Sequence, residues 1–186
     1  MPKKIVRPKT IDERRSAVGK LQRQLLILEA RIEQTFAQIL PGPVDESWHF
    51  SFELINLDTE TFYTVAHDLV KVIALLLEKP EKTRFEKESA YRAVCRIRNE
   101  LIRHAYDATP IGNAYCGFGI GEPSGPVLKC GSGADPNDGF LDEGLFRNRD
   151  ALYAVCKEYG YPMPRLTNVE LTCLLNTLTA FRANMP

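Results

Sequence analysis

The chain has no hydrophobic run long enough to cross a lipid bilayer. Its longest strongly apolar run, VIALLL at 72–77, falls far short of the roughly 20 residues that a membrane-spanning helix needs. The amino-terminal stretch MPKKIVRPKT is basic, but it lacks the apolar segment and the small-residue cleavage site of a secretory signal. These absences argue against a membrane protein and predict a cytoplasmic one.

Cysteines are few and are not arranged as a metal site or a disulfide framework. The five cysteines are an odd number, form no C-x-x-C pair and have no histidine at ligand spacing. We therefore expect reduced, mostly buried thiols, with no metal ion and no cofactor.

The chain also lacks a net charge, since 24 Lys and Arg balance 24 Asp and Glu. This balance argues against a protein whose whole surface coats nucleic acid. Basic residues are concentrated locally instead: residues 1–25 carry eight Lys or Arg, and residues 92–103 carry four Arg against Glu100 alone. Residues 1–10 are expected to form a basic flexible tail.

What the sequence does have is helical periodicity. Its 186 residues, 44% apolar and 26% charged, have the composition of one globular domain. A heptad seam whose only polar member is Thr35 predicts a first helix over 11–40. Apolar faces predict further helices over 58–78, 83–106, 141–159 and 167–183. The predicted fold is therefore all-α, a helical bundle of about five helices in a single domain over 11–186.

Several of these helices have marked ends. A Thr followed three residues later by a Glu predicts a capping box at the start of three of them, at Thr10 with Glu13, Thr83 with Glu86, and Thr167 with Glu170. Gly160 suits the residue that follows a helix, where a left-handed backbone is common. The stretch VDESWHFSFELINL at 44–57 has room for a short irregular strand or turn, and its pattern assigns it to neither.

A long glycine-rich insertion separates the third and fourth predicted helices. Residues 107–139 hold eight of the twelve glycines of the chain and four prolines. They predict a long loop with room for one short hairpin, and loops of this length are often functional. The run CGFGIG at 116–121 lacks the Lys-Ser/Thr of a phosphate-binding loop and leads into no helix, so a loop or hairpin is favoured over a nucleotide site.

The stretch RNELIRHAYD at 98–107 concentrates groups that suit phosphodiester chemistry. Arginine offers a planar fork that matches two phosphate oxygens, and histidine can both accept and donate a proton near neutral pH. In RNA the 2′-hydroxyl already supplies the nucleophile. A protein then needs only a base, an acid and cations, and no metal ion.

Arg98, Asn99 and His104 resemble the R-x(4–6)-H signature of HEPN domains, the all-helical bundles of many toxin, phage-defence and CRISPR-associated ribonucleases. Tyr106 is similar to the H-x-Y extension of the HepT-like toxins in that family. The resemblance implies a metal-independent endoribonuclease acting as a toxin or defence effector, with RNA as substrate and an antitoxin or regulatory protein as partner. It also implies a homodimer in which the motif helices of two protomers form one cleft.

The same resemblance assigns roles to individual residues. Arg98 and His104 would be catalytic: Arg98 would bind the scissile phosphate and His104 would be the acid or the base. Asn99 would orient the substrate or the histidine, and Arg103 and Tyr106 would contact the RNA. In a regular helix, positions six apart are separated by about 120° around the axis, so Arg98 and His104 would not share a face within one straight helix. That spacing favours a cleft between two protomers or an unwound last turn.

Two other interpretations compete with the nuclease. The arginines could form a solvated helix face, supported by pairs such as Glu88 with Arg92. The chain could also be a non-catalytic helical module that dimerises through its first helix and binds nucleic acid or a protein partner. His67 falls on the polar side of the second predicted helix and is expected to be solvated.

Overall fold

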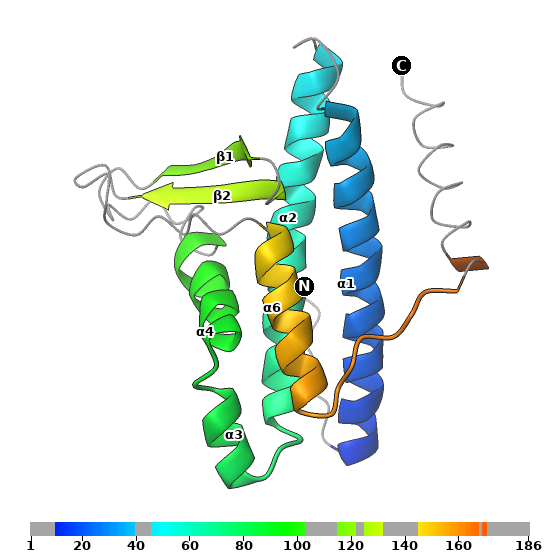
Figure 1. Cartoon of the computed structure of the whole chain (residues 1–186), viewed down its shortest axis with the longest axis vertical. Helices are drawn as coiled ribbons and strands as arrows, with labels where there is room; N and C mark the ends of the chain where they lie inside the picture. Colours follow the sequence, from blue (N-terminus) through cyan, green and yellow to red (C-terminus); the bar gives the residue numbers. More distant parts are fainter. Residues whose placement is uncertain are drawn as a thin grey trace, which may run out of the picture.

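Two long antiparallel helices form the centre of the molecule. The computed structural model describes residues 10–39, 46–102, 115–121, 125–131, 145–167 and 169–170. Helix α1 (Ile11–Ile39) and helix α2 (Glu46–Ala74) run side by side along the molecule (Figure 1). Arg14 Nη1 donates to the carbonyl oxygen of Leu75 at 3.0 Å, and Arg31 Nη2 lies 2.9 Å from Asp58 Oδ1. These two contacts fix the antiparallel direction of the pair.

Helix α1 begins and packs as the sequence predicts. The backbone N–H of Thr10 donates to Glu13 Oε2 at 3.0 Å, and the N–H of Glu13 donates to Thr10 Oγ1 at 3.1 Å. This reciprocal pair is the predicted capping box, which satisfies two N–H groups of the first turn. The predicted seam is buried within the chain at Val18, Leu25, Leu28, Ile32 and Thr35. These positions are therefore occupied by the protein's own core.

Helix α2 is longer than predicted, and the expected strand or turn before it is wrong. The helix begins at Glu46, twelve residues before the predicted start at Asp58. Asp58 and Thr59, the polar residues at the predicted start, interrupt the apolar pattern. Both residues are in fact buried on the core side of α2, with Asp58 3% exposed and paired with Arg31. Buried polar residues thus interrupted a continuous helical face.

The single helix predicted over 83–106 is instead a series of shorter elements. Its predicted start at Thr83 is wrong, because the Thr83 hydroxyl donates to the carbonyl oxygen of Lys79 at 2.9 Å from inside a helix. Pro80 occupies the first turn of that helix, where its missing N–H is not needed. The elements are α3 (Lys79–Phe85), α4 (Ser89–Arg96) and the π-helix η1 (Ile97–Ile102).

The glycine-rich insertion contains the short hairpin that the sequence allowed. Strands β1 (Tyr115–Gly121) and β2 (Gly125–Gly131) pair antiparallel, with Cys116 opposite Cys130. The hairpin lies beyond the ends of α4 and α6 (Figure 1). CGFGIG therefore lies in an antiparallel strand, and no nucleotide-binding loop is present in these described residues.

Helix α6 (Leu145–Glu158) packs against α4, is linked to α1 by side-chain contacts, and is followed by Gly160 as predicted. Gly160 has φ +85°, and the N–H of Tyr161 donates back to the carbonyl oxygen of Cys156 at 2.8 Å. This is a Schellman ending, which favours glycine because other residues are strained at positive φ. The buried amide of Gln22 on α1 then donates to the carbonyl oxygens of Tyr161 and Pro162, at 2.9 and 3.1 Å.

The last described segment starts a further helix. The N–H of Thr167 donates to Glu170 Oε2 at 2.8 Å, and the N–H of Glu170 donates to Thr167 Oγ1 at 3.2 Å. This confirms the predicted capping box. The remainder of the helix predicted over 167–183 lies outside the described residues.

The described part of the chain confirms the all-α class. It contains five α-helices and η1, with the hairpin as an addition. One core joins α1, α2, α3, α4 and α6 and includes Leu25, Phe62, Phe85, Val94 and Leu152. Within the described residues, no helix combines the length and the apolar character that crossing a membrane requires.

Candidate functional site: a basic seam between α2 and η1

Arg98 and Asn99 lie at the start of η1, just after α4. Both side chains are half-buried, and Arg98 Nη1 donates to Asn99 Oδ1 at 2.9 Å. No carboxylate of the described residues forms an ion pair with Arg98. Asn99 thus orients the guanidinium group itself. A guanidinium held in this way, with a neutral acceptor, keeps its charge available for an anion.

The backbone that carries the motif is not a regular α-helix. Residues Ile97–Ile102 form a π-helix, in which hydrogen bonds span five residues, and such turns occur frequently at functional sites. The separation of about 120° between Arg98 and His104 was calculated for a regular α-helix, so it does not apply here. His104, Arg103 and Tyr106 lie outside the described residues.

His67 lies on α2, which contacts η1, and the prediction that its side chain is solvated is wrong. Its side chain is only 14% exposed, and its Nδ1 lies 3.3 Å from Asp68 Oδ1. Burial lowers the pKa of His67, the hydrogen bond that His67 donates to Asp68 opposes this, and the positive charge of Arg98 lowers the pKa further. The imidazole is therefore held in its neutral form at neutral pH and lies within the electrostatic influence of Arg98.

Lys71, one helical turn after His67, adds a second cation. Its Nζ donates to the hydroxyl of Tyr91 on α4 at 2.8 Å and lies 5.0 Å from the centre of the Tyr91 ring. Burial alone would lower the pKa of Lys71, but the hydrogen bond to Tyr91 and the neighbouring Cys95 raise it overall. The lysine is therefore fully charged at neutral pH, and its position is fixed by an aromatic ring.

These groups form one surface feature, which we call the basic seam. Helix α2 contacts both α4 and η1. The seam comprises two cations and a neutral imidazole that is hydrogen-bonded to a carboxylate. Such an arrangement suits binding of a phosphate group together with proton transfer. Its members are His67, Asp68, Lys71, Tyr91, Arg98 and Asn99.

Sequence reasoning identified only the η1 part of this seam. The available signal for the α2 part was the spacing of His67 and Lys71, which are four residues apart and therefore lie on one helix face. That spacing was not decisive, because the pairing of α2 with η1 is a tertiary contact between residues about thirty positions apart.

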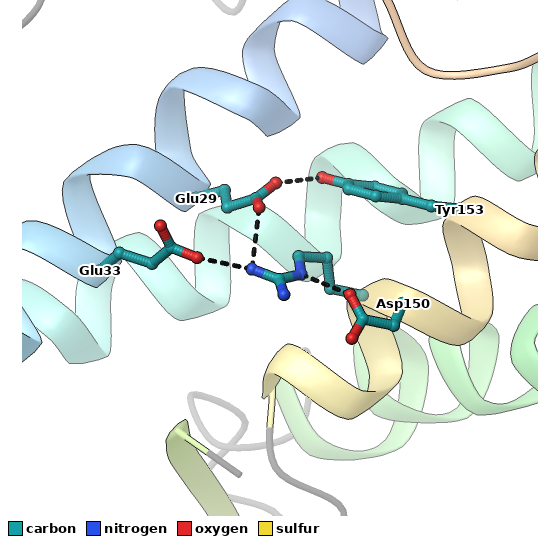
Figure 2. A network of polar contacts seen from close by, with 5 residues as sticks. Glu29, Glu33, Asp150 and Tyr153 are labelled. Atoms are coloured by element: carbon teal, nitrogen blue, oxygen red, sulfur yellow. Dashed lines mark hydrogen bonds and ion pairs between the residues drawn. The ribbon is translucent and has the colours of Figure 1, made fainter. Parts of the chain in front are cut away.

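A second polar cluster joins α6 to α1 (Figure 2). Arg149 contacts Glu29 at 2.8 Å, Glu33 at 2.7 Å and Asp150 at 2.9 Å, and Tyr153 donates to Glu29 at 2.8 Å. Burial is the largest influence on Glu29 and raises its pKa. Every member of this cluster is already bound to another, so we assign it a structural role in holding α6 against α1.

Metal chemistry and catalysis by a helical thiol gain no support within the described residues. No group of three His, Cys, Asp or Glu side chains there is placed to hold a metal ion. Cys95 and Cys156 are free thiols, and burial raises the pKa of Cys156 to about 12, which keeps it protonated and unreactive.

Comparison with protein-family models, with curated proteins and with solved structures found no match to this chain. The function must therefore be argued from the basic seam itself.

Proposed function

We propose that the chain is a metal-independent endoribonuclease of the HEPN type. The observation that supports this most directly is the environment of Arg98. Its guanidinium group is half-buried on the π-helix η1 and donates to Asn99. Among the described residues it has no carboxylate partner. An arginine with only a structural role would more often be paired with an acid.

In this proposal Arg98 binds the scissile phosphate and stabilises the charge that develops on it. His104 transfers a proton, and Asn99 holds the arginine in place. Arg103 and Tyr106 contact the RNA on either side. Two copies of the chain form the active enzyme, which acts as a toxin or phage-defence effector and is restrained by an antitoxin or another regulatory protein.

The test is cleavage of single-stranded RNA or transfer RNA by the purified protein in EDTA. We expect products that end in a 2′,3′-cyclic phosphate and a 5′-hydroxyl. Arg98→Ala and His104→Ala should each reduce the rate by at least about 100-fold, the usual size of such a contribution. The matched control is Arg92→Ala, which removes an exposed arginine from the neighbouring α4 and should cleave at the normal rate.

A folded protein that binds RNA and does not cleave it would support the other candidate, a non-catalytic helical module. The apolar heptad seam of α1 limits how that module could dimerise. Its residues already pack inside the chain, so dimerisation by a non-catalytic module would have to use another surface.

A further inference from the structure

The hairpin places two of the five cysteines of the chain directly opposite each other. Directly opposed residues of an antiparallel pair lie on the same face of the sheet, and every second pair shares that face. The face that includes the two cysteines is apolar at every position. Its pairs are Cys116 with Cys130, Phe118 with Leu128, and Ile120 with Pro126.

The backbone spacing at the cysteine pair suits a disulfide bond. Opposed residues of antiparallel strands have Cα atoms about 5.5 Å apart at hydrogen-bonded pairs and about 4.5 Å apart at the others. Disulfide bonds usually join Cα atoms about 4.4–6.8 Å apart. Both kinds of pair fall within that range, so the register alone gives Cys116 and Cys130 a suitable separation.

The cysteine pair stands near the open end of the hairpin. Within the described ladder, only the pair of Tyr115 with Gly131 lies further from the closed end at Gly121 and Gly125. Three of the seven residues of β1 are glycines, which weaken a strand because they have no side chain to pack. A hairpin of two strands is also only marginally stable by itself. The open end is therefore where a covalent bond would change the pairing most.

The other cysteines have no comparable arrangement. Cys156 is fully buried on α6, where burial raises the pKa of its thiol to about 12 and keeps it protonated. Cys95 is a free thiol on α4, and Cys173 lies outside the described residues. In the part of the chain that the structure describes, only the hairpin sets two cysteines at facing positions of a ladder.

We propose that Cys116 and Cys130 form a reversible redox modification site that reacts with low-molecular-weight disulfides such as oxidised glutathione. A disulfide bond between the two cysteines closes the open end of the hairpin, and its reduction releases that end. The proposal rests on the register of the hairpin and does not depend on the proposed nuclease activity.

The chemistry is a thiol–disulfide exchange in two steps. The thiolate of one cysteine attacks a sulfur of oxidised glutathione, whose S–S bond breaks, and one glutathione leaves and takes up a proton. The thiolate of the other cysteine then attacks the protein sulfur of this mixed disulfide. The S–S bond between the two cysteines forms, and a second reduced glutathione leaves. The cysteines lose two electrons and two protons, which the two glutathione molecules carry away.

The first experiment counts free thiols in a series of glutathione buffers. The purified full chain is equilibrated with rising ratios of oxidised to reduced glutathione, quenched with acid and alkylated. We expect the number of alkylated cysteines to fall from five to three and to return to five in dithiothreitol. Trypsin cuts after Lys129, so Cys116 and Cys130 fall on separate peptides that only the new bond holds together. Absence of these linked peptides in the most oxidising buffer would overturn the proposal.

The matched control moves one thiol by a single position. The double variant Cys130→Ser, Lys129→Cys places a thiol opposite Gly117, on the other face of the hairpin from Cys116. Since side chains that point apart cannot be bridged, half conversion should need at least about a tenfold higher ratio of oxidised to reduced glutathione. Equal conversion of the variant and the natural protein would show that the register is not responsible, and would overturn the proposal.

The second experiment measures what the bond does to the hairpin. Hydrogen exchange of the backbone amides is followed by mass spectrometry in the reduced and the oxidised protein. Exchange in β1 and β2 should be at least about tenfold slower in the oxidised protein, with no change in α2. Cys116→Ser, which cannot form the bond, should exchange at the same rate under both conditions. Unchanged or faster exchange in the oxidised hairpin would show that the bond does not close it.

Discussion

Arg149 on α6 and Glu29 on α1 form a half-buried ion pair, with Nη1 and Oε1 2.8 Å apart. The same guanidinium lies 4.9 Å from the ring centre of Phe146 and holds two further carboxylates. One arginine is therefore the cation that three carboxylates of α6 and α1 share.

Removing that arginine should destabilise the fold. Arg149→Met leaves the Glu29, Glu33 and Asp150 carboxylates close to one another without a cation, and it should lower the free energy of unfolding by about 2 kcal/mol, because the side chain is largely buried. Urea unfolding measures the change. Arg147→Met alters an exposed arginine of the same helix and should change the stability by less than about 0.5 kcal/mol. Equal effects of the two variants would mean that the cluster contributes nothing specific.

Glu29 should make the protein more stable as the pH falls toward 4.5. Burial raises its pKa in the folded protein above the value of 4.5 for an exposed glutamate. Its stabilising contribution is therefore fully present below pH 4.5 and is lost as the pH rises through the folded pKa. Glu29→Gln should remove this part of the pH dependence and keep an acceptor for Tyr153. Unfolding free energies measured from about pH 7 down to 4.5 should separate the two proteins, and parallel curves would contradict the prediction.

The titration of His67 in the absence of RNA should follow its neighbours. Burial and the charges of Arg98 and Lys71 lower its pKa below 6.5, and Asp68 acts in the opposite direction. Because the folded pKa is lowered, the neutral ring contributes stability above pH 6.5, and that stability is lost as the pH falls through the folded pKa. Arg98→Met should raise the midpoint seen by NMR, and Asp68→Asn should lower it. If neither variant changed the titration midpoint of His67, the ring would lie away from Arg98 and Asp68.

The aromatic contact between α3, α4 and α6 should be among the most sensitive parts of the core. Phe85 is fully buried, with its ring centre 5.3 Å from that of Tyr91 and 4.9 Å from that of Tyr159. Phe85→Ala should cost about 3–5 kcal/mol of stability in thermal or urea unfolding. Leu75→Ala removes a side chain that is 49% exposed and should cost much less. A similar cost for both would show that α3 is not part of the core.

Two threonines distinguish a true cap from an apparent one. Thr10→Ala removes the capping oxygen of α1 and should cost about 1 kcal/mol. Thr83→Ala removes a hydroxyl that bonds only to its own preceding turn, so the cost should lie within about 0.5 kcal/mol. Denaturation midpoints of the two variants provide the comparison. A larger loss at Thr83 would restore the boundary that the sequence suggested.

Local patterns predicted the elements whose stabilising contacts are local. The bounds of α1, two of the three capping boxes and the glycine that ends α6 depend on residues a few positions apart, so they could be read directly. The start of α2 could not be predicted in this way, because Asp58 and Thr59 interrupt the apolar face of the helix. Asp58 is stabilised by Arg31 from another helix. The division of the third predicted helix was likewise hidden, since no glycine or proline stands between α3 and α4.

The candidate site likewise has a part that the sequence predicted and a part that it did not. Arg98 and Asn99 were found from their spacing in one segment, and the structure adds the contact between them. His67, Lys71 and Tyr91 join the site through the packing of α2 on α4 and η1, which no short pattern records. Long-range contacts between helices therefore bring the residues of α2 and α4 into the candidate site.

The buried amide of Gln22 has a consequence for how the protein is made. Its two backbone partners, at Tyr161 and Pro162, are synthesised about 140 residues later. While the chain emerges from the ribosome, the first helix can pair with the second, but the Gln22 amide finds these two acceptors only after residue 162 has been made. The last contacts of α1 therefore form only after every residue of the basic seam has been synthesised.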